Sequence, residues 1–246
     1  MSHSTFDVTA DGEPAADVLV VGLSSPGFAG VTATDYLTRH LPSEAVGHVS
    51  PAEFPTITPF AEGRPRNPTR IYDIEDTALA AVVGELFVPV PAAPAFVDSL
   101  LSWVEEAGIS EIVVPYGIPF PHGPEEHDVF TVATDAFREH RLEGSGFDGL
   151  RGGVLDGPVG ELVARSMNGA APPTGALLTP VHSPGPDLEA AIRLVDALES
   201  LYGVDVDEGE LRRQSRELQE YYATLADRMN AIEEGSRDYP EDRSYM

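Results

Sequence analysis

Residues 17–41 read DVLVVGLSSPGFAGVTATDYLTRHL, and this stretch decides the fold class. It begins with an apolar run from Val18 to Leu23, continues through a Ser-Ser-Pro-Gly turn, and ends with apolar residues at helical spacing. A short apolar run, turn residues and then a helical period predict a strand buried on both faces, a tight turn and a helix. We therefore expect the first strand–turn–helix unit of an α/β domain.

The turn between this strand and this helix is a candidate ligand site. Ser24, Ser25, Gly27 and Gly30 put small side chains and free backbone N–H groups at the start of the helix, where an anion can bind. The spacing of the glycines matches neither G-x-G-x-x-G nor a phosphate loop with its terminal Lys-Ser/Thr. Two interpretations stay open, namely a purely structural turn and a ligand-binding turn.

The charge of the chain is the second global feature. The formal net charge is −26, from 41 acidic and 15 basic residues, and every basic residue is arginine. A salt-rich cytoplasm explains this composition, because high ionic strength screens carboxylate repulsion while a carboxylate shell keeps the surface hydrated. The absence of a basic stripe argues against a nucleic-acid partner. The absence of cysteine excludes disulfides and thiol catalysis.

The order of apolar runs and turn residues predicts four segments. They are a disordered leader (1–16), an α/β domain (17–203), a C-terminal helix (204–234) and a flexible acidic tail (235–246). Within the domain, alternating strand and helix patterns predict a mostly parallel sheet with helices on both faces. Neither a signal-peptide pattern nor an apolar run of about eighteen residues occurs, so we expect a cytoplasmic protein with no membrane partner.

Two loop regions carry further expectations. The prolines and arginines of Pro55–Pro68 predict a projecting loop or hairpin, and Gly152–Gly160 reads as a strand, a glycine turn and the start of a helix. A loop over residues 115–128 gathers potential metal ligands, namely His122, Glu125, Glu126, His127 and Asp128. Divalent metals accept such ligands, but prolines and glycines stand where a helix face would fix them. No metal site and no cofactor are predicted.

The C-terminal helix carries a seven-residue repeat. Apolar or aromatic residues recur as in a coiled-coil seam for about three heptads, at Leu211, Leu218, Tyr222, Leu225, Met229 and Ile232. Ser215 interrupts this seam. The helix is either amphipathic and packed on its own domain, or part of an interface between subunits.

Taken together, three stretches resemble the proteasome assembly chaperones of the second-subunit type, whose prokaryotic members are often labelled ATP-grasp-like. They are the Gly22–Leu41 unit, GGVLDGPVGELV from Gly152, and PDLEAAIRLVDALESLYGVDVD with the long helix after it. The acidic composition resembles that of a haloarchaeal member of this family. The resemblance implies an α/β fold similar to nucleoside phosphorylases, a homo-oligomer, and a role in proteasome assembly or docking with proteasome α subunits as partners. It supplies no catalytic residues.

Two functions follow as hypotheses. The first is a non-enzymatic assembly chaperone or adaptor of the proteasome. The second is an enzyme acting on a nucleoside or acyl phosphate at the Ser24–Gly30 turn, although the chain has no lysine to contact a phosphate. The tail adds a partner-binding candidate, since Tyr245 and Met246 resemble the docking tails of proteasome activators, with Ser244 at the position where those tails have a hydrophobic residue.

Overall fold

The expected strand, turn and helix of residues 17–41 lie at the centre of the fold. They form β2 (Val18–Leu23), a 3-10 turn (Pro26–Phe28) and α1 (Ala29–His40), and all six residues of β2 are buried. The computed structural model describes residues 6–12, 14–52, 57–120, 122–123, 126–182 and 185–237, except for the side chains of residue 223 and residues 225–237.

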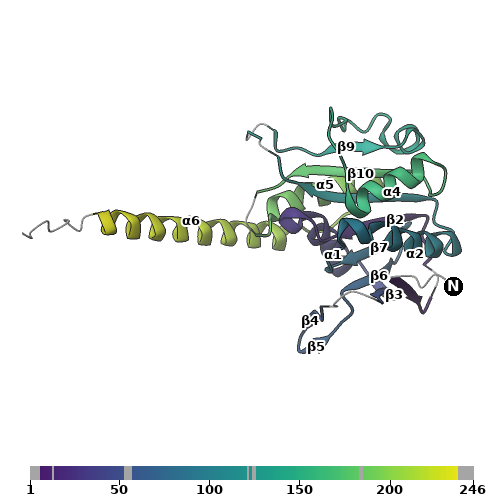
Figure 1. Ribbon diagram of the computed structural model, residues 1–246, viewed down its shortest axis with the longest axis horizontal. Helices are drawn as coiled ribbons and strands as arrows, with labels where there is room; N and C mark the ends of the chain where they lie inside the picture. The colour runs from purple at the N-terminus through teal and green to yellow at the C-terminus, as the bar shows by residue number, and fades with distance from the viewer. Residues whose placement is uncertain are drawn as a thin grey trace, which may run out of the picture. The chain divides into compact units, whose positions relative to one another are not determined.

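Eight strands make one mixed sheet (Figure 1). Their spatial order is β1 (Phe6–Ala10), β3 (Ser43–Pro51), β6 (Thr69–Ile74), β7 (Leu79–Gly84), β2, β8 (Glu111–Ile118), β10 (Thr174–Pro180) and β9 (Phe130–Ala133). The central strands β7, β2, β8 and β10 are parallel, as predicted. The strands that flank them pair antiparallel, because hairpin-type connections lead from β3 to β7 and β9 returns beside β10.

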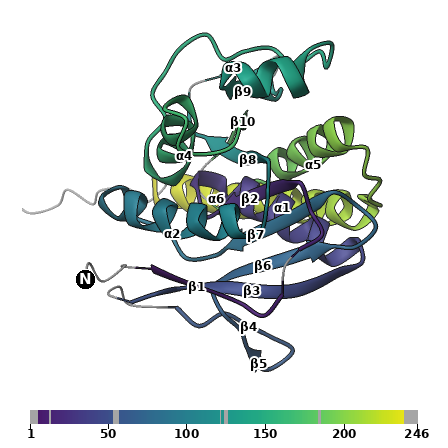
Figure 2. The same cartoon turned by 90° about the vertical axis from the view of Figure 1, so that its right-hand side faces the viewer.

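Helices cover both faces of this sheet, which confirms the predicted α/β class (Figure 2). On one face α1 packs against β2, β7 and β8 and against α5 (Leu188–Tyr202). The other face carries α2 (Ala93–Glu106) and α4 (Gly157–Met167), which contact each other. Local signals set the bounds of α5, since the Asp187 carboxylate accepts the Ala190 N–H at its start and Gly203 adopts a left-handed conformation at its end.

The N-terminal segment differs from the predicted disordered leader. Residues Phe6–Ala10 form β1, which pairs with β3 along its whole length. Phe6 is buried and its ring meets Phe96 of α2 edge-on, with 5.3 Å between the centroids. The prediction failed because the segment is polar overall, whereas its stability comes from one buried aromatic side chain and a partner strand distant in sequence.

The strand predicted at the start of Gly152–Gly160 is also wrong. Residues 152–156 are irregular, and the Val154 side chain is 92% exposed, so burial gives no drive toward a strand there. The helix that was expected next does form, as α4. The expected projecting hairpin is present in the described part of Pro55–Pro68, where β4 (Phe60–Ala61) pairs with β5 (Arg64–Pro65).

The remaining helices are short, with one exception. A 3-10 turn (Val90–Ala92) precedes α2, and α3 (Asp135–Phe137) continues as a π-helical turn (Arg138–Leu142). The chain divides into two units, Met1–Asp207 and Glu208–Met246, and the second contains α6 (Gly209–Arg237). None of the helices in the described ranges is both long and apolar enough to cross a membrane.

Candidate functional site

Polar residues follow three of the parallel strands at their carboxyl ends. Ser24 follows β2, Glu85 follows β7, and His182 comes two residues after β10. In open α/β sheets, ligands bind outside the carboxyl ends of the strands, where loops leave the sheet in different directions. A ligand site is therefore expected at this edge.

The Ser24–Gly30 turn is tightly packed against its neighbours. A Cβ atom on Gly30 would collide with the Pro115 carbonyl oxygen of β8, and one on Gly27 would crowd Val181. The Ser24 hydroxyl donates to the Glu85 carbonyl oxygen at 2.9 Å. The two glycines thus have a packing role, because they let α1 approach the sheet.

Two residues of the turn are not explained by packing. Phe28 has a φ of 52°, a left-handed conformation that is rare for a bulky residue, and its side chain is 47% exposed. The Ser25 hydroxyl is buried and has no hydrogen-bond partner among the described residues. A strained backbone and an unsatisfied buried hydroxyl are both features of functional sites.

Beside this turn lies a groove of about 530 Å³. Most of its lining is apolar and comes from Phe28, Val31, Ile57, Pro59 and Pro186. The charged groups that line it, among the residues that the structure describes, are the two carboxylates of Asp35 and Glu85. The groove is thus suited to an apolar group rather than to a phosphate, because no basic side chain of the described ranges lines it.

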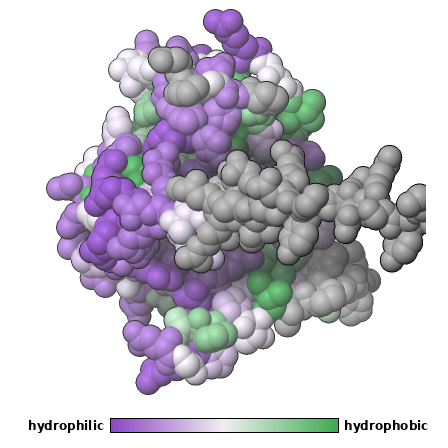
Figure 3. Space-filling view, turned by 90° about the vertical axis from the view of Figure 1, so that its left-hand side faces the viewer, coloured by the Kyte–Doolittle hydropathy of each residue, from purple (hydrophilic) through white to green (hydrophobic). Residues whose placement is uncertain are grey.

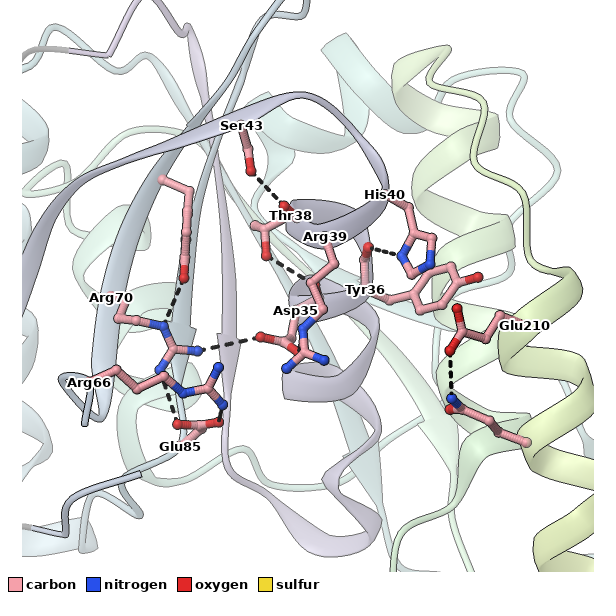
Figure 4. Close-up of polar contacts among 12 residues, drawn as sticks. Asp35, Tyr36, Thr38, Arg39, His40, Ser43, Arg66, Arg70, Glu85 and Glu210 are labelled. Atoms are coloured by element: carbon pink, nitrogen blue, oxygen red, sulfur yellow. Dashed lines mark hydrogen bonds and ion pairs between the residues drawn. The ribbon is translucent and has the colours of Figure 1, made fainter. Parts of the chain in front are cut away.

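An ion-pair cluster holds both carboxylates in place (Figure 4). Arg70 of β6 bonds to Glu85 at 3.0 Å and approaches Asp35 of α1 at 3.4 Å. Arg66 adds a second bond to Glu85 at 2.6 Å, and Arg39 pairs with Asp35 at 2.7 Å.

Arg70 is the centre of this cluster, with a side chain only 7% exposed. Its guanidinium also donates to the Tyr72 hydroxyl at 2.8 Å and to the Asn67 carbonyl oxygen at 2.9 Å. Burial lowers the pKa of Arg70, but Tyr72 and Glu85 outweigh burial and raise it. Tyr72, Asn67, Glu85 and Asp35 thus accept four of the five N–H groups of this cation, which fixes the wall of the groove.

Three histidines form a second polar cluster at the same edge of the sheet. His122 and His127 follow β8, and His182 comes from the end of β10; the centroids of their rings are 5.0–5.1 Å apart. Arg193 of α5 lies near them and donates to the Thr179 hydroxyl and to the Pro180 carbonyl oxygen. Partial burial, followed by the positive charge of Arg193, lowers the pKa of His127.

A larger hollow, of about 690 Å³, lies at the opposite edge of the sheet. Of its charged lining residues Asp98, Glu105 and Arg165, the first and the last pair with each other at 2.8 Å. This hollow is at the amino ends of the parallel strands, away from the position where α/β folds bind ligands.

The predicted site residues are placed as follows. Ser24, Ser25, Gly27 and Gly30 lie together beside the groove. The predicted seam positions Leu211, Leu218 and Tyr222 lie on the helix α6, whereas the side chains of Leu225, Met229 and Ile232 are outside the described residues.

Other predicted residues make local hydrogen bonds or lie outside the described residues. The Glu126 carboxylate accepts the Gly123 N–H, and the Asp128 carboxylate accepts the Val129 N–H. Glu125, Tyr245 and Met246 lie outside the described residues.

Sequence reasoning missed two features of this edge. It did not predict the Arg70 cluster, nor that His182 joins His122 and His127. In both cases the residues come from separate elements, and no spacing in the sequence connects them.

The fold and the site together define an α/β protein with a mixed eight-stranded sheet and a groove at the carboxyl ends of its parallel strands. The model of the PAC2 family matches residues 19–226, and the chain belongs to this family. The predicted resemblance to the second-subunit type of proteasome assembly chaperones is thereby confirmed. A comparison with curated protein sequences gives no match.

Solved structures support this assignment at the level of the fold. Pyrococcus furiosus PbaA, an archaeal homolog of proteasome-assembly chaperone, matches with a TM-score of 0.80 at 19% identity, over 97% of this chain and 100% of that chain. P. furiosus PbaB, an archaeal proteasome activator, gives 0.76 at 19% identity, over 91% and 99%. A PAC2 family protein from Streptomyces avermitilis gives 0.62 at 22% identity, over 85% and 96%.

Proposed function

We propose that this protein is a proteasome assembly chaperone or proteasome-binding adaptor, which acts as a homo-oligomer and without catalytic turnover. The observation that carries the proposal is membership of the PAC2 family together with a fold that matches PbaA over nearly the whole chain. PbaA is named as a homolog of proteasome-assembly chaperone and PbaB as a proteasome activator. The partner proposed here is a subunit of the proteasome core, in line with the predicted α-subunit contact.

The groove is the proposed contact surface. Protein interfaces often have an aromatic anchor that loses its water when the partner binds. The apolar lining of the groove and the exposed Phe28 ring offer such an anchor. Figure 3 shows one face of the molecule on which small hydrophobic patches interrupt a largely hydrophilic surface. On such an acidic protein, an exposed apolar groove is a strong candidate for a binding site.

The predicted high-salt cytoplasm is part of the proposal. A net charge of −26 without lysine suits a protein that works while salt screens its carboxylates. Under those conditions ionic contacts with a partner are weak, whereas apolar contacts are maintained or strengthened. This favours a binding mode centred on Phe28 over one centred on charge.

A second candidate function rests on Ser25. Its buried hydroxyl has no hydrogen-bond partner within the described ranges, which favours a small ligand beside the groove, as an enzyme acting on a nucleoside or acyl phosphate would require. Against it, the groove lining presents Asp35 and Glu85 and, within the described residues, no basic side chain. The neighbouring Arg66 and Arg70 are already paired with Glu85, so the described lining offers a phosphate no basic partner, and we place this candidate second.

The experiment that tests the proposal compares two surface substitutions in molar KCl. Phe28→Asn removes the exposed ring, and asparagine tolerates the left-handed conformation better than phenylalanine, so the fold is preserved or stabilised. Val154→Asn is the matched control, because Val154 is an exposed apolar residue outside the groove. Binding to immobilised proteasome core particles is measured for both variants and for the wild type.

We expect the wild type and Val154→Asn to bind alike and Phe28→Asn to bind at least about tenfold more weakly, which corresponds to an anchor that contributes about 1.4 kcal/mol or more. No binding by the wild type would refute the proteasome role. Equal binding by all three proteins would keep that role but exclude the groove as its surface. Turnover of a nucleoside or acyl phosphate that Ser25→Ala abolishes would establish the second candidate instead.

A further inference from the structure

The side chains of His122, His127 and His182 meet although they come from two different loops. Each offers one ring nitrogen, and these three nitrogens all lie within 4.8 Å of one another. The residues belong to the loop after β8 and to the end of β10, two parallel neighbours in the sheet. Adjacent strand ends therefore bring together ligands that the sequence keeps apart.

The hydrogen bonds of His122 determine which of its nitrogens is available. Its Nδ1 lies 2.6 Å from the Phe120 carbonyl oxygen, which can only accept, so Nδ1 carries the proton. In the neutral ring Nε2 then has a lone pair. This Nε2 is buried, so solvent does not reach it, and it has no hydrogen-bond partner among the described residues. A buried acceptor of this kind requires an explanation.

His182 is oriented in the same manner by a carboxylate. Its Nδ1 lies 2.9 Å from Oδ2 of Asp187, which also accepts the His182 backbone N–H at 2.8 Å. The carboxylate fixes the proton on Nδ1 and leaves the Nε2 lone pair available. Histidines that bind a metal through one ring nitrogen usually donate the N–H of the other ring nitrogen to a carboxylate or carbonyl oxygen.

We propose that His122, His127 and His182 bind a divalent transition-metal ion, with Zn²⁺ as the first candidate, and that Asp187 positions His182. Three imidazole nitrogens suit Zn²⁺, Co²⁺, Ni²⁺ or Cu²⁺ and are a poor site for Mg²⁺ or Ca²⁺, which prefer oxygen. Zn–N bonds of about 2.0–2.1 Å in tetrahedral geometry place ligand nitrogens about 3.3 Å apart. The present separations are no more than 4.8 Å, so the rings need to close by at most about 1.5 Å on binding.

The site has three protein ligands and leaves the fourth position of a tetrahedral ion open. A water molecule or a group from another molecule completes the coordination. Binding also links the loop after β8 to the end of β10 and the start of α5, and ligand binding to the folded state alone raises its stability. This inference is independent of the proteasome role, because it requires neither the groove nor the partner.

The test uses untagged, full-length protein from which metal has been removed with EDTA, followed by dialysis. Zn²⁺ binding is measured by titration calorimetry in molar KCl with excess Mg²⁺, which occupies the carboxylates of this acidic surface. Co²⁺ serves as a second probe, because its visible absorption reports a tetrahedral nitrogen environment. His140→Ala is the matched control, since His140 is exposed and outside the cluster.

We expect one Zn²⁺ per chain for the wild type and for His140→Ala, and loss of this binding in the triple variant His122→Ala/His127→Ala/His182→Ala. Asp187→Asn keeps an N-cap oxygen for Ala190, but its amide favours the wrong tautomer of His182. We expect it to weaken Zn²⁺ binding about 10- to 100-fold.

Circular dichroism shows whether each variant is folded, and the Co²⁺ spectrum of the wild type gives a readout that does not depend on the variants. No stoichiometric Zn²⁺ binding by the wild type, or equal binding by the folded triple variant, would overturn the proposal. The three rings would then be an ordinary aromatic cluster. Unchanged affinity in Asp187→Asn would remove Asp187 from it.

Discussion

Replacement of Arg70 by methionine tests whether the buried ion-pair cluster stabilises the fold. Methionine retains most of the volume of the arginine stem, so the change removes the charge and its hydrogen bonds without opening a large cavity. The matched control is Arg39→Met, which removes another partner of the same Asp35 and changes the net charge by the same amount. The Arg39 side chain is 56% exposed, whereas that of Arg70 is 7% exposed.

The magnitude follows from this difference in exposure. Loss of one partner of a buried ion pair costs about 3–5 kcal/mol. The partners of Arg70 are 21–27% exposed and each keeps a second arginine, so we expect a loss of about 2–3 kcal/mol in the free energy of unfolding. Arg39→Met should cost only about 0.2–1 kcal/mol.

Salt separates the two cases further. At about 1 M salt the Debye length is about 3 Å, so the exposed Arg39 pair is screened while the buried Arg70 contacts are not. Urea unfolding in molar KCl, followed by the fluorescence of the single tryptophan, measures both variants, because Trp103 is buried in the core of the α/β unit. Equal losses of unfolding free energy for Arg70→Met and Arg39→Met in molar KCl would refute the reasoning.

Four further predictions concern the whole chain and its candidate surfaces. The melting temperature, followed by circular dichroism, should fall as KCl is lowered from molar to about 0.1 M, because unscreened carboxylates repel one another; an unchanged value would contradict the halophilic interpretation. Leu218→Asp/Leu225→Asp should lower the mass measured by light scattering if the seam joins subunits, since unpaired buried carboxylates cost several kcal/mol, roughly. Tyr245→Ala should weaken retention on proteasome core particles without altering the fold, through loss of an aromatic anchor; equal retention would remove the tail from the interface. The pKa of Asp187 is lowered, because hydrogen bonds from Ala190 and His182 outweigh burial. Its carboxylate therefore stabilises the fold above the unfolded pKa of about 3.8. In EDTA, the free energy of unfolding of the wild type should exceed that of Asp187→Asn above this pH, and the difference should disappear as pH falls through the lower, folded pKa.

The parts of the fold that were predictable have local signals. The apolar run of β2, the turn at Gly27 and the helical period of α1 lie next to one another, as do the Asp187 cap and the Gly203 end of α5. The direction of the flanking strands was not predictable, because an apolar run looks the same in a parallel and an antiparallel pair. β1 was missed since its burial depends on β3 and Phe96, which its own residues do not indicate.

The candidate site also has parts with a local sequence signal and parts without one. Glycines and serines marked the Ser24–Gly30 turn, because a sharp turn needs particular residue types in one short stretch. The charge cluster gave no such mark, since Arg70, Glu85 and Asp35 come from three elements and each looks like an ordinary surface charge in the sequence. In so acidic a chain a single carboxylate does not indicate a site. A buried arginine paired with two carboxylates does indicate one, but its burial is seen only in the structure.

His122 and His127 alone likewise did not predict a metal site, because two histidines in one loop are too few ligands. The third histidine and its carboxylate become visible only when β8 and β10 lie side by side. Residues that act together at the edge of a parallel sheet are joined by strand order, and strand order is the property that the linear pattern of this chain leaves open.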